Sequence, residues 1–569
     1  MMMKRILIWT ALLVASVPAL AQPKFAAKVK KGIVSVNTYD RKGDLLRQGT
    51  AFYVGANGEA IADYKLFKGA YKAVVVDAAG KKADVDCVLG ADDTYSLVRF
   101  RVETKGNTVL PAVASVLPMK STLFVLNPDE KGTLRSEQAV VEDTSMIQGK
   151  YVYYGLDKKV DDHLLGSPVF NAEGRLVGIL HSSMGEKSYV LDARYRELLK
   201  MEAFPTRSAT AALGNIFLHK GLPDNAEEAL VYIYFKSRAT SNEEYMDMVD
   251  RFVDTYPQNA EGYLRRATPL IDLHRFDDAE RDLQKYLSLA EDKPTANLNV
   301  GSTIFDKLRL QPEPVYDKWN YDVVVEYLDK AISLNESTAD AEQKKQMDSR
   351  CKERKAQVLM SKEDYGGALA IYEALNQGED RSPAYYYAIS LARDARGDSA
   401  SAAIEPLDSA IAMMGTPLPT EAATYVIRRG QLLANAGRYR EAVQDYNQYC
   451  YLMNNKVSAV FYYERSQIEV NGRLFQQALD DINKTVEMAP RNALYQVEKA
   501  AITIRLGLYD DCIQACQAAI SLNPNIVDAY RILGYAQLQK GDKANARINL
   551  QKAVELGDEA AQKIIGTYL

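Results

Sequence analysis

The sequence predicts a multidomain chain, with an all-β domain in its N-terminal third and an all-α array of repeated helix pairs after it. Three observations support this prediction. Short runs with strand composition, separated by turn residues, fill residues 24–201. From residue 226 to residue 569 the pattern becomes helical, and its last units repeat every 34 residues. A basic and then apolar leader precedes both parts, at residues 1–21.

The leader predicts a signal peptide. Lys4 and Arg5 precede an apolar run at residues 6–17, and small residues lead up to Ala21. We expect cleavage after Ala21. A retained membrane anchor is the weaker alternative, because the run is shorter than the roughly 20 residues that cross a bilayer. No cysteine stands at the cleavage site, and no later stretch could cross a membrane. We therefore expect an exported protein, periplasmic or secreted, without a transmembrane segment after cleavage.

Charge and cysteine content argue against several classes of function. Lys and Arg total 70 against 75 Asp and Glu, a net charge of -5, so a basic surface for nucleic acid is not expected. Cys512 and Cys516 are one helical turn apart, about 5–6 Å at Cβ, whereas a disulfide needs about 3.5–4.5 Å. The four histidines do not cluster with the cysteines at ligand spacing. We expect no disulfide framework, no metal site and no cofactor.

The C-terminal repeats have the residue pattern of closely packed helix pairs. Units begin at Ala459, Ala493 and Val527, each 34 residues after the one before. Gly534 and Ala546 are small where antiparallel helices approach closely. This period and pattern resemble the tetratricopeptide (TPR) repeat. The resemblance implies a superhelical solenoid whose concave face binds a protein or peptide partner.

We expect about nine such units over residues 226–569, interrupted by an insertion near 291–303, with a linker or helix at 202–225 before them. Eight side chains on the inward faces of first helices are candidates for contact with the partner. They are Arg265, Tyr385, Arg428, Gln431, Tyr463, Gln467, Arg531 and Tyr535. The alternative for each tyrosine is that it packs between helices.

Several segments of the N-terminal domain together resemble trypsin-like serine proteases of the HtrA type. They are GTAFYV at 49–54, NGEAIA at 57–62, GAD at 90–92, LVRFRV at 97–102, LNP at 126–128 and LLGSPVFN at 164–171. The resemblance implies two six-stranded β-barrels with a cleft between them. In this family a serine attacks, a histidine accepts its proton and an aspartate orients the histidine.

The resemblance places those three residues on Leu165, Lys65 and Ser96, respectively, and the oxyanion glycine on His163. None of the three can perform the family's chemistry, and the chain has no histidine before His163. The catalytic triad is therefore expected to be degenerate.

Three hypotheses follow. The leading one is a non-catalytic binding scaffold, with the β-domain as an accessory binding module. The second is an active serine peptidase with non-standard residues, in which Ser167 acts with His163 or His181. The third gives the β-domain a structural role, capping the first repeat. The HtrA-type resemblance behind a signal peptide implies a Gram-negative bacterial protein.

Overall fold

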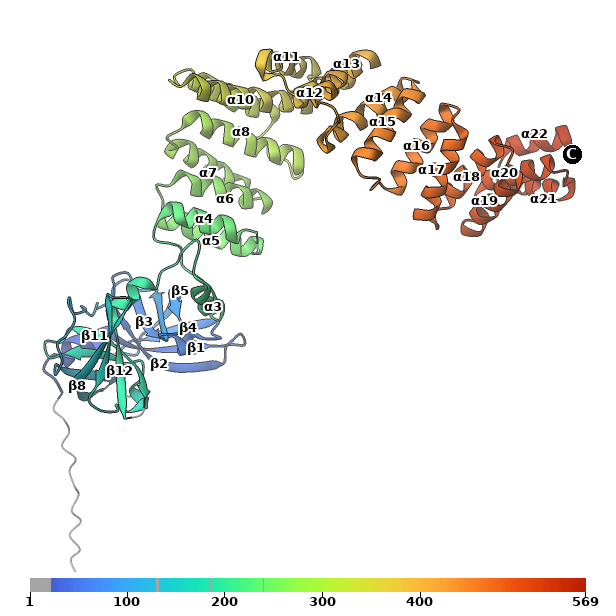
Figure 1. Ribbon diagram of the computed structural model, residues 1–569. Coiled ribbons are helices and arrows are strands. Elements are labelled where there is room, and N and C mark those ends of the chain that lie inside the picture. The colour runs from blue at the N-terminus through green and yellow to red at the C-terminus, as the bar shows by residue number, and fades with distance from the viewer. Residues whose placement is uncertain (1–21, 129–132, 185, 239) are drawn as a thin grey trace, which may run out of the picture. The chain divides into compact units, whose positions relative to one another are not determined.

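The computed structural model describes residues 22–128, 133–184, 186–238 and 240–569 (Figure 1). The predicted signal peptide lies outside these residues. The chain divides into two compact units, residues 1–290 and residues 291–569. The first unit contains all of the described strands and the first helix pairs, and the second unit is helical.

The first β-barrel is closed by six antiparallel strands in the order β1-β2-β3-β6-β5-β4. Alternate residues of the strands point inward, so Val34 and Val36 of β1 are buried together with Phe100 of β6. The pairing of β1 with β4 closes the cylinder. The strands are β1 (Ile33–Tyr39), β2 (Leu45–Tyr53), β3 (Glu59–Asp63), β4 (Lys72–Val76), β5 (Lys82–Asp92) and β6 (Leu97–Val102).

The second barrel is also closed by six strands, in the order β10-β11-β12-β9-β8-β7. Its core includes Leu123, Val152 and Tyr154, all fully buried. The two barrels confirm the predicted all-β double-barrel architecture. The strands are β7 (Thr122–Pro128), β8 (Leu134–Ile147), β9 (Tyr151–Leu156), β10 (Pro168–Asn171), β11 (Leu176–Met184) and β12 (Lys187–Asp192).

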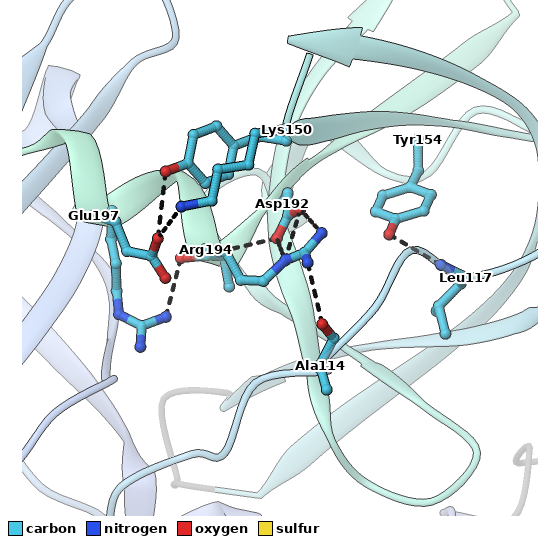
Figure 2. A network of polar contacts seen from close by, with 10 residues as sticks. Ala114, Leu117, Lys150, Tyr154, Asp192, Arg194 and Glu197 are labelled. Carbon is cyan, nitrogen blue, oxygen red and sulfur yellow. Dashed lines mark hydrogen bonds and ion pairs between the residues drawn. The ribbon is translucent and has the colours of Figure 1, made fainter. Parts of the chain in front are cut away.

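A buried carboxylate fixes the end of the second barrel (Figure 2). Asp192 is fully buried, and the Arg194 guanidinium donates to both of its oxygens, at 2.6–3.0 Å. Arg194 also reaches the Ala114 carbonyl, 3.3 Å away. A buried charge is tolerated when it is paired and hydrogen-bonded in this way. The pair thus ties the 114–117 loop to the end of β12.

Residues 202–225 do not form a free linker. Within them α3 (Arg207–Gly214) packs on the first barrel, and the Tyr64 hydroxyl donates to the Ala212 carbonyl over 3.1 Å. Further along, the Gly221 N–H donates to the Val88 carbonyl over 2.8 Å. This segment therefore belongs to the fold of the β-domain.

The first helix pair shares the core of the first barrel. Helices α4 (Ala226–Lys236) and α5 (Asn242–Thr255) contribute Ile233 and Phe252 to the cluster that contains Phe100 of the barrel. Beside this contact, Arg251 of α5 forms an ion pair with Asp86 of β5 at 2.7 Å. The barrel and the first pair are thus packed as one body.

The helices from α6 to α21 also occur in antiparallel pairs, as the TPR pattern predicted. The first unit continues with α6 (Ala260–Asp272) and α7 (Phe276–Leu289). The second unit contains the pairs α8 (Lys293–Leu310) with α9 (Tyr321–Asn335), α10 (Ala341–Ser361) with α11 (Tyr365–Leu375), α12 (Pro383–Arg396) with α13 (Ala400–Met413), α14 (Ala423–Asn435) with α15 (Tyr439–Leu452), α16 (Ala459–Asn471) with α17 (Phe475–Met488), α18 (Ala493–Arg505) with α19 (Tyr509–Leu522) and α20 (Val527–Gln539) with α21 (Lys543–Glu555), followed by α22 (Glu559–Tyr568).

The insertion predicted over residues 291–303 is wrong, because these residues begin the regular helix α8. Val300 and Ile304 of α8 are buried, and α8 pairs with α9. The residues in excess of the 34-residue period lie in the connection between α8 and α9 and in the long helix α10. The connection is held by Lys307, whose ammonium donates to the carbonyls of Pro312 and Pro314 at 3.2 and 2.7 Å.

An arginine–aspartate pair recurs inside three of the helix pairs. In each case an arginine of the first helix makes two hydrogen bonds, at 2.5–2.9 Å, to an aspartate 16 residues later in the second helix. Planar guanidinium and carboxylate groups match in this two-point geometry. These pairs fix the packing of first against second helix. They are Arg266 with Asp282, Arg429 with Asp445 and Arg465 with Asp481.

Candidate functional site

The three segments that carry the triad positions meet around Asp63, at the end of β3. Ser96 has a left-handed backbone, φ 47°, and its hydroxyl donates to Asp63 over 2.7 Å. Lys65 follows in the short helix α2 (Tyr64–Phe67) and is exposed. Gly166, next to the half-buried Leu165, lies so close that a Cβ on it would be 3.4 Å from the Cβ of Asp63. The structure therefore brings the segments of Lys65, Ser96 and Leu165 together.

The side chains at these positions do not form a hydroxyl–imidazole–carboxylate relay. Leu165 offers no nucleophilic atom, and the Ser96 hydroxyl is engaged by the Asp63 carboxylate. Lys65 supplies an ammonium group where the relay needs a neutral base that accepts a proton. Asp63 was not predicted as a site residue, although it lies only two residues before Lys65 in the sequence.

The loop that would form the oxyanion hole is closed on itself. An oxyanion hole needs backbone N–H groups aimed at one point outside the loop. Here the N–H groups of residues 163–167 all donate within the protein, at 2.7–3.2 Å. Their acceptors, in order, are the Asp161 carboxylate and the carbonyl oxygens of Asp161, Asp162, Leu180 and Leu164. In this conformation each of the five N–H groups therefore has an acceptor within the protein.

The serine considered as a displaced nucleophile is fully buried. Ser167 Oγ receives a 2.6 Å hydrogen bond from the side-chain amide of Asn127. His163 is exposed on the short 3₁₀ helix Asp162–Leu164. His181 instead hydrogen-bonds through Nδ1 to the Tyr153 hydroxyl. The hypothesis of an active peptidase requires an exposed hydroxyl on Ser167, whereas this hydroxyl is buried in the structure.

His181 of β11 lies among aromatic side chains on β9 and β12. The Tyr153 ring stacks on Tyr189 with centroids 5.2 Å apart, and the Tyr153 hydroxyl is 2.9 Å from Ser182 Oγ. Burial lowers the pKa of His181, and the positive charge of Lys65 lowers it further, against the opposing effect of Asp63. His181 is therefore held in its neutral form at neutral pH.

The candidate contact residues of the helical array are mostly half-buried. Tyr535 is the most exposed of the eight, with 37% of its surface accessible. Several of the others connect neighbouring first helices. These contacts are Arg428 with Asp394 at 2.5 Å, Gln467 with Glu498 at 3.2 Å, Tyr463 with Tyr495 at 5.1 Å between centroids, and Arg531 with Asp558, ahead of α22, at 2.8 Å.

The three other candidates for partner contact are Tyr385, Gln431 and Arg265. Tyr385 packs against the core of the α10–α12 region, and Gln431 is half-buried on α14. Arg265 interacts with the Tyr245 side chain of α5, and its buried Nε has no hydrogen-bond partner in the described part of the chain. Tyr385 and Tyr463 thus pack between helices, which was the alternative for the tyrosines.

A cavity of about 370 Å³ opens on the first-helix side of α8, α10 and α12 in the second unit. Its walls include Phe305 and Arg309 from α8, Arg354 from α10 and Leu391 from α12. This cavity was not predicted from the sequence, because the residues that begin α8 were expected to form an insertion. Aromatic and basic residues in consecutive first helices were the signal that could have found it.

In the described part of the chain, no helix is long and apolar enough to cross a bilayer. No group of three or more His, Cys, Asp or Glu side chains is arranged to hold a metal ion there. The five cysteines are buried free thiols.

Sequence comparisons identify relatives of the helical part. A tetratricopeptide-repeat family model matches residues 504–561. The small glutamine-rich tetratricopeptide repeat-containing protein 2 of Saccharomyces cerevisiae is 26% identical over 95 residues, 16% of this chain and 28% of that protein. The DnaJ protein P58IPK homolog of Arabidopsis thaliana is 21% identical over 324 residues, 54% and 57% of the two chains. Hsc70-interacting protein 1 of Drosophila melanogaster is 29% identical over 82 residues, which are 14% of this chain and 22% of that protein. The chain thus spans between about a fifth and three fifths of the length of these relatives.

Among solved structures, the chain is similar to two proteases. The active form of the Rv3671c protease from M. tuberculosis has 16% identity and a TM-score of 0.28, over 32% of this chain and 85% of that chain. The serine endoprotease from Yersinia pestis has 14% identity and a TM-score of 0.27, over 30% and 62% of the two chains.

Proposed function

We propose that the chain is an exported, non-catalytic scaffold that binds a protein or peptide partner through its TPR array. The observation that carries this proposal is the series of helix pairs in the second unit, whose first helices contact one another through side chains such as Arg428 and Gln467. Repeats of this kind mediate protein–protein interaction. One relative is named for its interaction with Hsc70, which also favours a protein partner.

The proposal of a non-catalytic β-domain is supported by two independent features. Lys65, Ser96 and Leu165 stand at the family's catalytic positions, and the 163–167 loop uses its N–H groups internally. Loss of the nucleophile alone would leave an oxyanion hole able to bind substrate carbonyls. The combination instead favours an accessory binding or capping role over the alternative of an active peptidase.

The capping role is favoured by a specific observation, the core shared by the first barrel and α4–α5. The end of a repeat array exposes an apolar face that must be covered. In this chain Ile233 and Phe252 are covered in part by residues of the β-domain. This role is compatible with partner binding by the rest of the array.

The partner-binding proposal is tested by photocrosslinking with the full-length chain in its native host. A benzophenone amino acid replaces Tyr535, exposed on the first helix α20, or Tyr451, exposed on the second helix α15. We expect a specific crosslinked protein from position 535 and none from position 451. Equal crosslinking at both positions, or at neither, would count against partner binding on the first-helix face.

A second experiment compares fragments 226–569 and 22–225 as baits in host extract. We expect the helical fragment to recover the crosslinked protein, because its stacked helices offer the longer binding surface. Recovery by the β-domain fragment alone would assign binding to that domain.

The proposed export has its own test. Intact-mass analysis of the protein from fractionated cells should find a chain beginning at Gln22 in the periplasm or medium. A chain that retains Met1 in the cytosolic fraction would contradict export.

A further inference from the structure

Helices α8, α10 and α12, labelled in Figure 1, line a cavity that combines an apolar floor with a basic rim. Phe305, Tyr372 and Leu391 supply much of the apolar lining, together with Met360. The unbranched thioether of methionine adapts to apolar groups of different shape. The cavity lies wholly within the second unit, and its lining comes from three consecutive first helices and from Tyr372 of the second helix α11.

The rim of the cavity is positively charged. Its nine lining residues include two arginines, Arg309 and Arg354, and no carboxylate. This composition stands out in a chain whose net charge is -5. Asp306 approaches Arg354 only to 3.8 Å, and both side chains are partly exposed, so solvent weakens their attraction.

The two arginines are placed differently at the rim. Gln357 accepts a 3.2 Å hydrogen bond from Arg354 Nη1, and the Arg354 guanidinium lies 5.7 Å from the centre of the Phe305 ring. Arg354 is thus held against the apolar floor by a hydrogen bond and by cation–π attraction. Arg309 is exposed at the last turn of α8, next to the exposed Leu310. Its guanidinium can therefore meet an incoming carboxylate.

We propose that this cavity is the anchor site for an acidic segment of the partner, with one apolar side chain inserted and neighbouring carboxylates paired with Arg309 and Arg354. The proposal rests on the proposed function of the array as a protein-binding surface. Charge complementarity selects this occupant, because a basic segment would be repelled by both guanidinium groups. The apolar floor selects an inserted leucine or phenylalanine over a purely polar acidic tract.

The test uses full-length mature protein and a fluorescein-labelled, C-terminally amidated peptide in which one leucine is flanked by aspartate and glutamate. Fluorescence anisotropy should show saturable binding that weakens as NaCl is raised. Replacing the leucine of the peptide with glycine should raise Kd at least tenfold, and so should replacing its acidic residues with amides. Absence of saturable binding, or equal binding of a lysine-flanked peptide, would overturn the proposal.

Matched variants of the protein locate the site. Arg309→Glu should raise the Kd of the acidic peptide at least tenfold, whereas Lys352→Glu, the same charge change at an exposed residue of α10 outside the cavity lining, should change it less than twofold. Ala388→Trp fills the cavity and should also abolish binding. Circular dichroism of each variant checks its fold. Unchanged affinity in folded Arg309→Glu and Ala388→Trp proteins would overturn the proposal.

Crosslinking from Tyr535 distinguishes failure of this site from failure of the proposed function. If the cavity variants bind the peptide normally while the Tyr535 crosslink persists, the anchor assignment is wrong and partner binding by the array stands. If the unmodified array gives no crosslink, the proposed function itself fails.

Discussion

The side-chain amide of Asn127 donates a 2.6 Å hydrogen bond to the Oγ of Ser167 and lies 3.2 Å from the Oγ of Thr50. Asn127 is the penultimate residue of β7 in the second barrel, whereas Thr50 lies in β2 of the first. The buried serine therefore belongs to a polar link between the two barrels. A hydroxyl held in this way contributes to structure and is not presented to a substrate.

The first prediction concerns catalysis. Purified mature protein should show no labelling by a fluorophosphonate probe and no hydrolysis of casein, because the exposed hydroxyl, the base and the free oxyanion N–H groups are all lacking around Leu165. Gel fluorescence after probe treatment measures labelling, with an active trypsin-like protease as positive control. Labelling that disappears in Ser167→Ala would contradict the prediction.

Restoring the nucleophile alone extends this test. Leu165→Ser should remain inactive, because Lys65 is no base for it and members of a catalytic triad act as a unit. Measurable casein hydrolysis by the Leu165→Ser protein would mean that the loop rearranges to form an oxyanion hole.

The second prediction concerns packing in the C-terminal repeats. A Cβ on Gly534 would lie 2.6 Å from Cγ of Leu550 and 3.1 Å from the carbonyl oxygen of Ala546. Gly534→Leu should therefore destabilise the array by about 1–3 kcal/mol. Ala546→Leu should act similarly, since Ala546 is fully buried. Urea unfolding of the full-length protein, followed by circular dichroism, gives the change in unfolding free energy.

Lys543→Glu is the control, because Lys543 is exposed at the start of α21. Its unfolding midpoint should stay close to that of the unmodified protein. Equal destabilisation by all three substitutions would show that these small residues are not at a close helix contact.

The parts of the fold that repeat or alternate could be predicted from the sequence, and the parts held by single polar contacts could not. A 34-residue period identifies α16–α21 because each pair buries the same small positions. The period fails near α8, where tertiary packing of Val300 and Ile304 sustains a helix in a segment of irregular spacing. Periodicity carries no information about such irregular packing.

The candidate site, too, could be predicted only in part from the sequence. The resemblance to protease motifs placed Lys65, Ser96 and Leu165 at the catalytic positions, but it could not reveal that Asp63 contacts Ser96 and lies beside Gly166. Nor could it reveal the closed 163–167 loop, since backbone hydrogen bonds depend on conformation rather than residue type. Arg428 and Arg531 were chosen as binding residues, and both form ion pairs within the array.

The third prediction concerns pH and the buried Glu469 of α16, which is 3% exposed. Burial, together with the nearby charge of Asp481, raises the pKa of this carboxyl to about 8, against the opposing effect of Arg465. In the unfolded chain its pKa is near the ordinary 4.5. Between these values the folded protein binds more protons than the unfolded one. The unfolding free energy should therefore fall as pH rises, by at most about 1.4 kcal/mol per unit.

Glu469→Gln should remove this part of the pH dependence, so that unfolding midpoints in urea change less between pH 5 and pH 8 than in the unmodified protein. Glu487→Gln serves as the control, because Glu487 is exposed on the neighbouring helix α17. If Glu469→Gln and Glu487→Gln give the same pH profile as the unmodified protein, Glu469 is ionised in the folded state.

The last prediction tests whether the β-domain caps the array. Removal of residues up to 221 uncovers the apolar face of α4 and α5, including Ile233, Val249 and Phe252, and eliminates the ion pair of Arg251 with Asp86. Helices that lose apolar cover open more often, so their amides should exchange faster. Hydrogen–deuterium exchange of the 222–569 fragment should show lost protection in α4 and α5 relative to the full chain. Protection in α18 and α19, which make no contribution to that core cluster, should be unchanged and is the internal control. If α4 and α5 exchange as slowly in the fragment as in the full chain, the first helix pair is stable without the barrel, and capping is not the role of the β-domain.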